Sequence, residues 1–138
     1  MANNIVIRYS ALPKLLTKDR QTFLSSLDVR LSTVNLAPDP AGSNGQFTEP
    51  TDSGYAPLNL TYGAPFLNGS NQGETDAAVD QWTFTHSAGD FTVYAQFATD
   101  PADSDEWVWA ALSTLPFTCV AAGQMLQAVD SWLNTRLP

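Results

Sequence analysis

The stretch GDFTVYAQFATDPADSDEWVWAAL, from Gly89 to Leu112, decides the fold of this chain. Its first half places Phe91, Val93, Ala95 and Phe97 on one parity and Thr92, Tyr94 and Gln96 on the other. Such alternation is typical of a half-buried β-strand. A second apolar run follows an acidic break and carries Trp107 and Trp109 on one parity. We therefore expect two core strands joined by a polar connection.

The acidic break contains four carboxylates, at Asp100, Asp103, Asp105 and Glu106. A calcium loop of the EF-hand type needs a fixed spacing, with a glycine and a distant glutamate that are not found here. A catalytic carboxylate pair needs a cleft that shifts one pKa. We expect a solvated polar turn whose charge discourages pairing of strand edges. A weak calcium site is the alternative that the residues leave open.

The rest of the chain predicts one mainly-β domain behind a short helical segment. Apolar residues between Leu12 and Leu27 follow helical spacing, although Thr17 and Asp19 interrupt it, so two short helices are an alternative. Short strand-like runs then recur between turn signals, and residues 37–54 and 63–80 are expected to be loops. The predicted fold is an antiparallel β-sandwich of six to eight short strands, with one N-terminal helix and an extended N-terminal arm. We assign the arm to residues 1–11 and the domain to residues 12–138.

Charge is distributed unevenly along the 138 residues. Residues 1–30 hold five cations and two acids, a net charge of +3, whereas residues 31–138 hold one cation and twelve acids, a net charge of −11. So acidic a body repels nucleic acid and anionic membrane surfaces, and no apolar stretch has the length of a membrane span. The single cysteine, Cys119, lies in an apolar setting and is expected to be a buried, inert thiol.

The residues that carry chemistry form no recognisable catalytic set. His86 is the one histidine, and no serine lies in a G-x-S-x-G turn. We therefore expect no enzyme activity, no catalytic residue, no cofactor and no metal. The four tryptophans are expected to pack in the core, with a sugar-stacking platform built on Trp107 and Trp109 as the alternative.

Six stretches, taken in order, resemble a widespread group of small virion proteins of tailed phages. Members of that group open with a helix and continue through similar strand and loop sequences. The matching stretches are LDVRLSTVN (27–35), FTEPTDSGYAPL (47–58), QWTFTHS (81–87), FTVYAQFATD (91–100), EWVWAALS (106–113) and VAAGQMLQ (120–127). The resemblance implies a β-sandwich structural protein of the virion, assembled in the host cytoplasm.

Within that group the chain is expected to be a capsid decoration (cement) protein. Its partners would be the major capsid protein or other virion proteins, together with copies of itself. A tail or baseplate component, or a carbohydrate-binding module for host adsorption, is the alternative function.

An N-terminal arm lying across a neighbouring subunit would be the binding device, together with the two long loops. The expected apolar anchors are Ile5, Val6, Ile7 and Tyr9, and the cations expected to meet acids of a partner are Arg8, Lys14, Lys18 and Arg20. The alternative for the arm is a first strand of the chain's own sheet.

Overall fold

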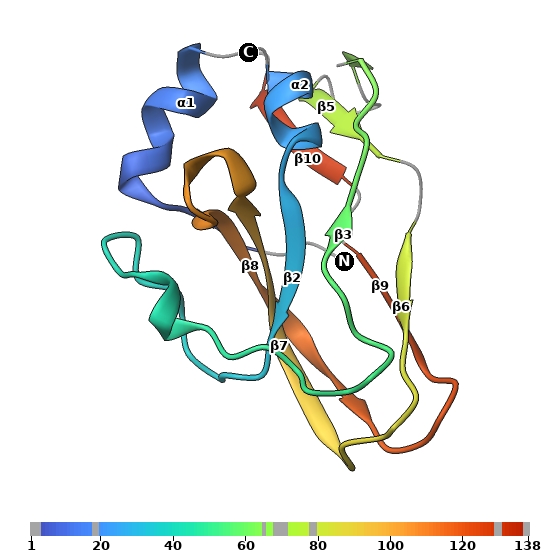
Figure 1. Ribbon diagram of the computed structural model, residues 1–138. Coiled ribbons are helices and arrows are strands. Elements are labelled where there is room, and N and C mark those ends of the chain that lie inside the picture. Colours follow the sequence, from blue (N-terminus) through green and yellow to red (C-terminus); the bar gives the residue numbers. More distant parts are fainter. Residues whose placement is uncertain are drawn as a thin grey trace.

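The fold is mainly β, as predicted, and sandwich-like, with short helices near its N-terminus (Figure 1). The structure is a computed structural model that describes residues 4–17, 20–64, 66–67, 72–77, 80–128 and 131–136. The helices are α1 (Leu12–Thr17) and α2 (Arg20–Ser25), so the described residues support two short helices rather than one. Short 3-10 turns η1 (Tyr9–Ala11), η2 (Asn44–Gln46) and η3 (Pro101–Asp103) complete the helical elements.

Three antiparallel sheets organise the described residues. The five-stranded sheet runs in the order β1 (Asn4–Ile7), β8 (Glu106–Cys119), β7 (Phe91–Asp100), β2 (Asp28–Ser32) and β3 (Leu58–Asn59). The three-stranded sheet runs in the order β10 (Ser131–Arg136), β5 (Gln72–Asp76) and β4 (Phe66–Leu67). The two-stranded sheet pairs β6 (Gln81–Thr83) with β9 (Met125–Gln127). Ten strands are therefore described where six to eight were expected, partly because β4 and β5 lie in the predicted loop 63–80.

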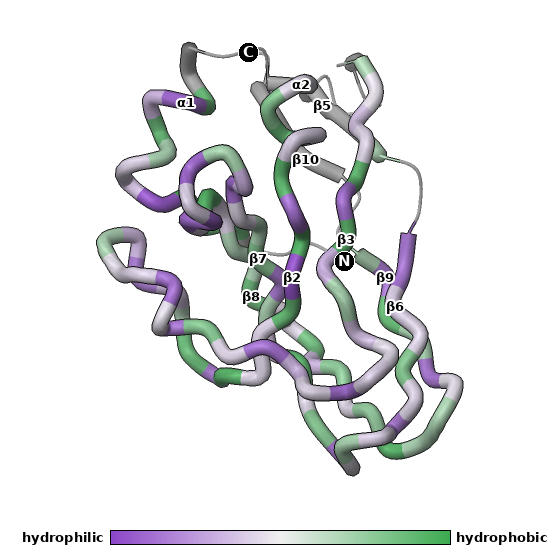
Figure 2. The backbone as a smooth tube through the Cα atoms, in the orientation of Figure 1, coloured by the Kyte–Doolittle hydropathy of each residue, from purple (hydrophilic) through white to green (hydrophobic). Residues whose placement is uncertain are grey.

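The main core lies on one face of the five-stranded sheet. Leu15, Phe23 and Leu24 from the helical segment and Trp82 and Phe84 from the β6 region pack there. Figure 2 shows hydrophobic residues concentrated on the paired strands β7 and β8, with more hydrophilic residues on the surrounding connections. The helices and the β6–β9 pair thus bury the same sheet face, which is the arrangement a sandwich requires.

A second, smaller cluster lies on the opposite face of that sheet. It consists of Phe97, Trp107 and Ala110, with Val6 and Phe47 packed against it. Phe47 comes from the long connection between β2 and β3, so this connection covers the second face instead of standing free in solvent.

A β-bulge in the β7–β8 hairpin explains why two neighbouring indoles use different faces. Ala98 pairs with Trp109 and Thr99 with Trp107, so Val108 is an extra residue in β8. A bulge of this kind reverses the alternation of side chains along its strand. Trp109 packs in the main core and Trp107 in the second cluster, and the prediction that they share one face is wrong.

A second irregularity divides the apolar side of β7. Val93 pairs with Phe117, but the next pair in register joins Ala95 to Leu112, so the register shifts and β8 has several extra residues between them. Val93 packs in the main core, whereas Phe97 packs in the second cluster. The single apolar face predicted from Phe91 to Phe97 is therefore shared between two cores.

Candidate partner-binding surface

The segment predicted as a free arm is an edge strand of the chain's own sheet. Strand β1 pairs antiparallel with β8, with Ile5 opposite Ala111 and Ile7 opposite Trp109. Both isoleucines are half-buried against the main core. The structure thus shows the alternative that the sequence left open, a first strand of the chain's own sheet. Residues 4–7 therefore belong to the domain rather than to a separate arm.

Two of the predicted partner-binding cations contact acids of the same chain. Arg8 Nη1 lies 2.6 Å from Glu106 Oε2, and the Arg8 backbone N–H donates to the Val108 carbonyl. Lys14 Nζ lies 3.2 Å from Asp100 Oδ2 and 2.5 Å from Asp103 Oδ2. The hydrogen bond that Lys14 donates to the Asp103 carboxylate is the main cause that raises the pKa of Lys14 above its ordinary 10.5. The prediction placed the acids on a partner, whereas these contacts are intramolecular.

The side chains of the other two predicted partner-binding cations lie outside those that the structure describes. Lys18 lies outside the described residues, and Arg20 is described only as the first residue of α2. Their binding role stays a prediction.

Tyr9 differs from the other predicted anchors because its side chain faces solvent. The residue is 63% exposed, and its backbone N–H donates to the carbonyl of Pro40 at 3.1 Å. Leu12, at the start of α1, is also exposed. Tyr9 therefore lies beside the 37–54 loop, so the structure brings together two segments that were predicted separately to bind a partner.

Asp103 and Asp105 lie in the turn between β7 and β8, as predicted, whereas Asp100 ends β7 and Glu106 begins β8. Asp100 caps η3 by accepting a hydrogen bond from the Ala102 N–H at 3.1 Å, and Ser104 and Asp105 are left-handed, with φ of 55° and 56°. Asp100 is buried rather than solvated, because α1 covers it with Lys14. Among the described residues, no three His, Cys, Asp or Glu side chains are grouped closely enough to hold a metal ion.

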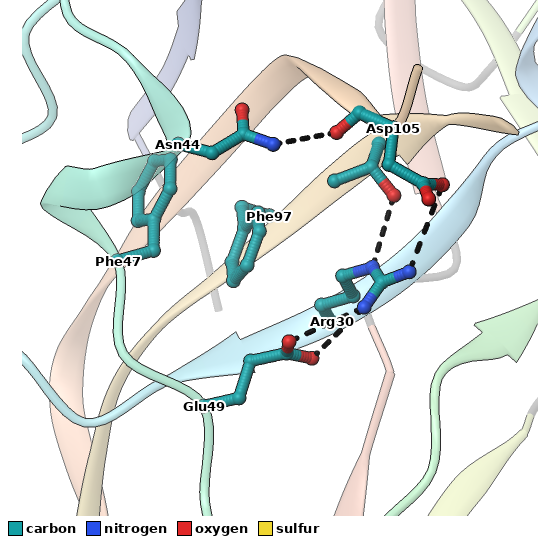
Figure 3. Close-up of a pocket in the computed structure, with 7 residues that line it drawn as sticks. Arg30, Asn44, Phe47, Glu49, Phe97 and Asp105 are labelled. Atoms are coloured by element: carbon teal, nitrogen blue, oxygen red, sulfur yellow. Dashed lines mark hydrogen bonds and ion pairs between the residues drawn. The ribbon is translucent and has the colours of Figure 1, made fainter. Parts of the chain in front are cut away.

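A small pocket lies where the 37–54 loop meets the sheet (Figure 3). Its volume is about 160 Å³, and its lining residues are Arg30, Asn44, Phe47, Glu49, Phe97, Thr99 and Asp105. The rings of Phe47 and Phe97 stack with their centroids 4.2 Å apart. This stack closes one wall of the pocket and attaches the loop to β7.

The guanidinium of Arg30 lies between two carboxylates in this pocket (Figure 3). Its Nε donates to Thr99 Oγ1 at 2.9 Å, its Nη1 lies 3.2 Å from Glu49 Oε2, and its Nη2 lies 3.8 Å from Asp105 Oδ1. Because the guanidinium is already paired on three sides, the pocket suits a structural role better than capture of an anion.

The hydroxyl of Tyr55 extends this network to the backbone of β2. It donates to Glu49 Oε1 at 2.5 Å and accepts from the Leu31 N–H at 3.1 Å. Burial of the phenol, followed by its hydrogen bond to the Glu49 carboxylate, raises the pKa of Tyr55 well above its ordinary 10.0. Tyr55 thereby joins the loop to the sheet through a neutral, hydrogen-bonded hydroxyl.

Asp52 fixes the other end of the loop. Its Oδ1 accepts from the N–H groups of Gly54, at 2.8 Å, and Thr85, at 3.0 Å, and its Oδ2 accepts from the Ser87 N–H at 3.2 Å. Burial opposes the charged form, but hydrogen bonds from Thr85, Gly54 and His86 outweigh it and lower the pKa of Asp52 below 3.8. The carboxylate thus connects the loop to the segment between β6 and β7.

His86 lies in that same segment with a left-handed φ of 60°. Its Nε2 lies 2.6 Å from Asp90 Oδ1, and both side chains are at least partly exposed. The pair spans a tight turn, in which the Gly89 N–H donates to the His86 carbonyl at 3.3 Å.

Burial decides whether the tryptophans offer a sugar-stacking platform. The exposed fractions are 2% for Trp82, 0% for Trp107 and 1% for Trp109, and the indole N–H of Trp107 donates to the Gly42 carbonyl at 2.9 Å. A stacking platform needs an open ring face, so these three rings are core residues. The side chain of Trp132 lies outside those described.

Sequence reasoning missed the two loop anchors, Arg30 with its carboxylates and Asp52. For Asp52 a signal was present, because the order Asp52-Ser53-Gly54 is typical of an Asx turn. For Arg30 there was none, since its partners Glu49 and Asp105 are distant in sequence. Within the described residues, no helix is long and apolar enough to span a membrane.

Comparison of the chain with models of protein families, with curated proteins and with solved structures finds no match.

Proposed function

We propose that the chain is a non-enzymatic structural protein of a tailed-phage virion and that it decorates the capsid. The six ordered stretches support the virion assignment, and the mainly-β, sandwich-like fold is compatible with it. In this proposal the protein binds the major capsid protein or another virion protein, and it works in many copies on one particle.

The observation that carries the proposal is the position of Tyr9 beside the 37–54 loop. The ring is 63% exposed, and the backbone contact with Pro40 places it next to a loop that is itself anchored at Phe47 and Asp52. Tyrosine is enriched at the centres of protein interfaces because it combines apolar area with one polar group. An anchored loop beside an exposed tyrosine therefore suits recognition of a protein surface.

This surface replaces the free arm of the sequence prediction. Ile5, Ile7, Arg8 and Lys14 contact the chain's own sheet and turn, so they hold Tyr9 in place rather than reach outward. Deleting the first ten residues would remove an edge strand together with the binding residue, and a point substitution at Tyr9 is the sharper test.

The test is co-sedimentation of the purified chain with empty shells, lacking this protein, of the phage that encodes it. Tyr9→Ala should weaken shell binding by about tenfold or more, as expected for an interface tyrosine. The control is Met125→Ala, because Met125 is 55% exposed but lies on β9 in another sheet. Its binding should equal that of the native chain.

Unchanged shell binding by a folded Tyr9→Ala variant would reject the proposed surface. The same assay with purified tails separates head from tail, because binding to tails and not to shells would reject decoration and favour a tail component. A chain that pellets with neither particle would contradict a virion role altogether.

A further inference from the structure

Strand β1 occupies a position that allows exchange between two copies of the chain. It is a strand of four residues at the edge of the five-stranded sheet, and it pairs with residues 109–112 of β8. A short edge strand, which is paired along one side, opens at a lower free energy than a central strand. The β8 segment that receives β1 lies about a hundred residues later in the chain, so a second copy offers the same segment.

Charge complementarity indicates which strand fits beside the edge of β8. Arg8 follows β1 directly and pairs with Glu106 at the start of β8, while the Arg8 N–H donates to the Val108 carbonyl. The apolar side chains of Ile5 and Ile7 fit the main core, and Val6 fits the second cluster on the other sheet face. The sequence of β1 satisfies both faces and the charged end, and another copy of the chain carries the same strand.

The link between β1 and α1 is suited to act as the hinge. It consists of η1 (Tyr9–Ala11), in which Tyr9 and Ser10 are exposed, whereas Lys14 attaches α1 to the β7–β8 turn of its own chain. Extending η1 would carry residues 4–8 away while α1 stays in place.

We propose that β1 is exchanged between two copies of this chain, each β1 pairing with β8 of the other copy in the register seen within one chain. The exchanged pair keeps the β1–β8 contacts of the closed chain, although extending η1 breaks the hydrogen bond from the Ala11 N–H to the Arg8 carbonyl. A high local concentration of the chain favours such exchange. The inference goes beyond the proposed function, because it concerns contact between copies and its test needs no shell.

The test uses two chains that each carry one cysteine. Both contain Cys119→Ala, one adds Asn4→Cys, and the other adds Leu112→Cys. Asn4 and Leu112 are register partners, and residues directly opposite in an antiparallel pair lie within the Cα range that a disulfide spans. Neither chain can form an internal disulfide, so a covalent heterodimer after mixing and mild oxidation reports β1 of one copy on β8 of the other.

The matched control replaces Leu112→Cys by Ala122→Cys, which is exposed in the β8–β9 turn and measures random collision. We expect heterodimer from the Asn4 and Leu112 pair at roughly tenfold the control yield, because a paired strand holds the thiols at a high effective concentration. Yields equal to the control, in variants that keep the native circular dichroism, would overturn the proposal.

A hinge variant gives a second readout that does not depend on cysteines at the strand. Ser10→Pro disfavours the helical conformation of Tyr9, the residue before proline, and so favours an extended hinge. Light scattering should show a larger dimer fraction for Ser10→Pro than for Ser10→Ala at equal concentration. An equal dimer fraction for the two variants would contradict exchange through this hinge.

Discussion

Lys14 Nζ lies 3.2 Å from Oδ2 of Asp100, a residue that the fold leaves only 3% exposed. The same ammonium lies 2.5 Å from Asp103 Oδ2. One cation of the first helix therefore neutralises two carboxylates of the β7–β8 turn. This contact attaches the basic N-terminal segment to the acidic remainder of the chain and gives the turn a structural role.

Lys14→Met should lower the free energy of unfolding by about 1–2 kcal/mol, between the values typical of exposed and of buried ion pairs. The buried carboxylate of Asp100 loses its cation in this variant, whereas Lys14→Arg keeps the charge and should lose less. Urea unfolding measures the difference.

The effect of Lys14 should depend on pH in a defined direction. Because the pKa of Lys14 is raised in the folded chain, its contribution is fully present below 10.5 and is lost as the pH rises through the folded value. The difference between the native chain and Lys14→Met should therefore vanish in strongly alkaline solution. A difference that persists there would show that the methionine acts through packing alone.

Gly54→Ala should destabilise the fold because a β-carbon has no room at this position. An added methyl would overlap the Thr83 carbonyl oxygen and lie 3.1 Å from Asp52 Oδ1. Overlap with backbone cannot be relieved by a side-chain rotation, so we expect a loss of about 1–3 kcal/mol in urea unfolding.

Gly45→Ala is the matched control, since its β-carbon would lie no closer than 3.5 Å to another group, at Ser43 Oγ. Alanine there should be neutral or slightly stabilising. Equal loss of stability in the two variants would mean that glycine flexibility matters and that crowding does not.

Particular residues show what the sequence could and could not predict. The β7–β8 hairpin and its acidic turn follow from alternation and from a cluster of turn residues. The face of Trp107 does not, because the bulge at Val108 leaves no mark in the alternation. The pairing of Arg8 with Glu106 joins residues far apart in the chain, and local patterns carry no signal for such contacts. Strands β4 and β5 were missed because polar residues and glycine mask a strand pattern between Phe66 and Asp76.

Tyr55→Phe should lower the free energy of unfolding by about 1–3 kcal/mol, because it leaves the Leu31 N–H without its acceptor. Glu49 also loses a donor, although Arg30 still pairs with it. Thermal unfolding measures the loss, and Tyr9→Phe is the control because that ring is exposed.

The raised pKa of Tyr55 gives an independent check on the same contact. In a spectrophotometric titration, the phenol of Tyr55 should resist ionisation well above pH 10.0, so the native chain should contain one more resistant phenol than Tyr55→Phe. If the phenol that Tyr55→Phe removes ionises at the ordinary pH of a tyrosine, the Tyr55 hydroxyl is not buried in the network described.

Asp52→Asn should destabilise the chain at neutral pH and also reduce its sensitivity to acid. The carboxylate accepts hydrogen bonds from Gly54, Thr85 and Ser87, and an amide would direct N–H groups toward some of these donors.

Because its pKa is lowered on folding, the carboxylate contributes stability above 3.8, which is lost as the pH falls through the folded value. The native chain and Asp52→Asn should therefore converge in stability from neutral pH down to about pH 2. Asp80→Asn is the control, since that exposed carboxylate accepts from the neighbouring Gln81 N–H. A gap between the native chain and Asp52→Asn that stays constant across the acid range would show that the asparagine acts by its shape and that the charge of Asp52 does not hold the loop.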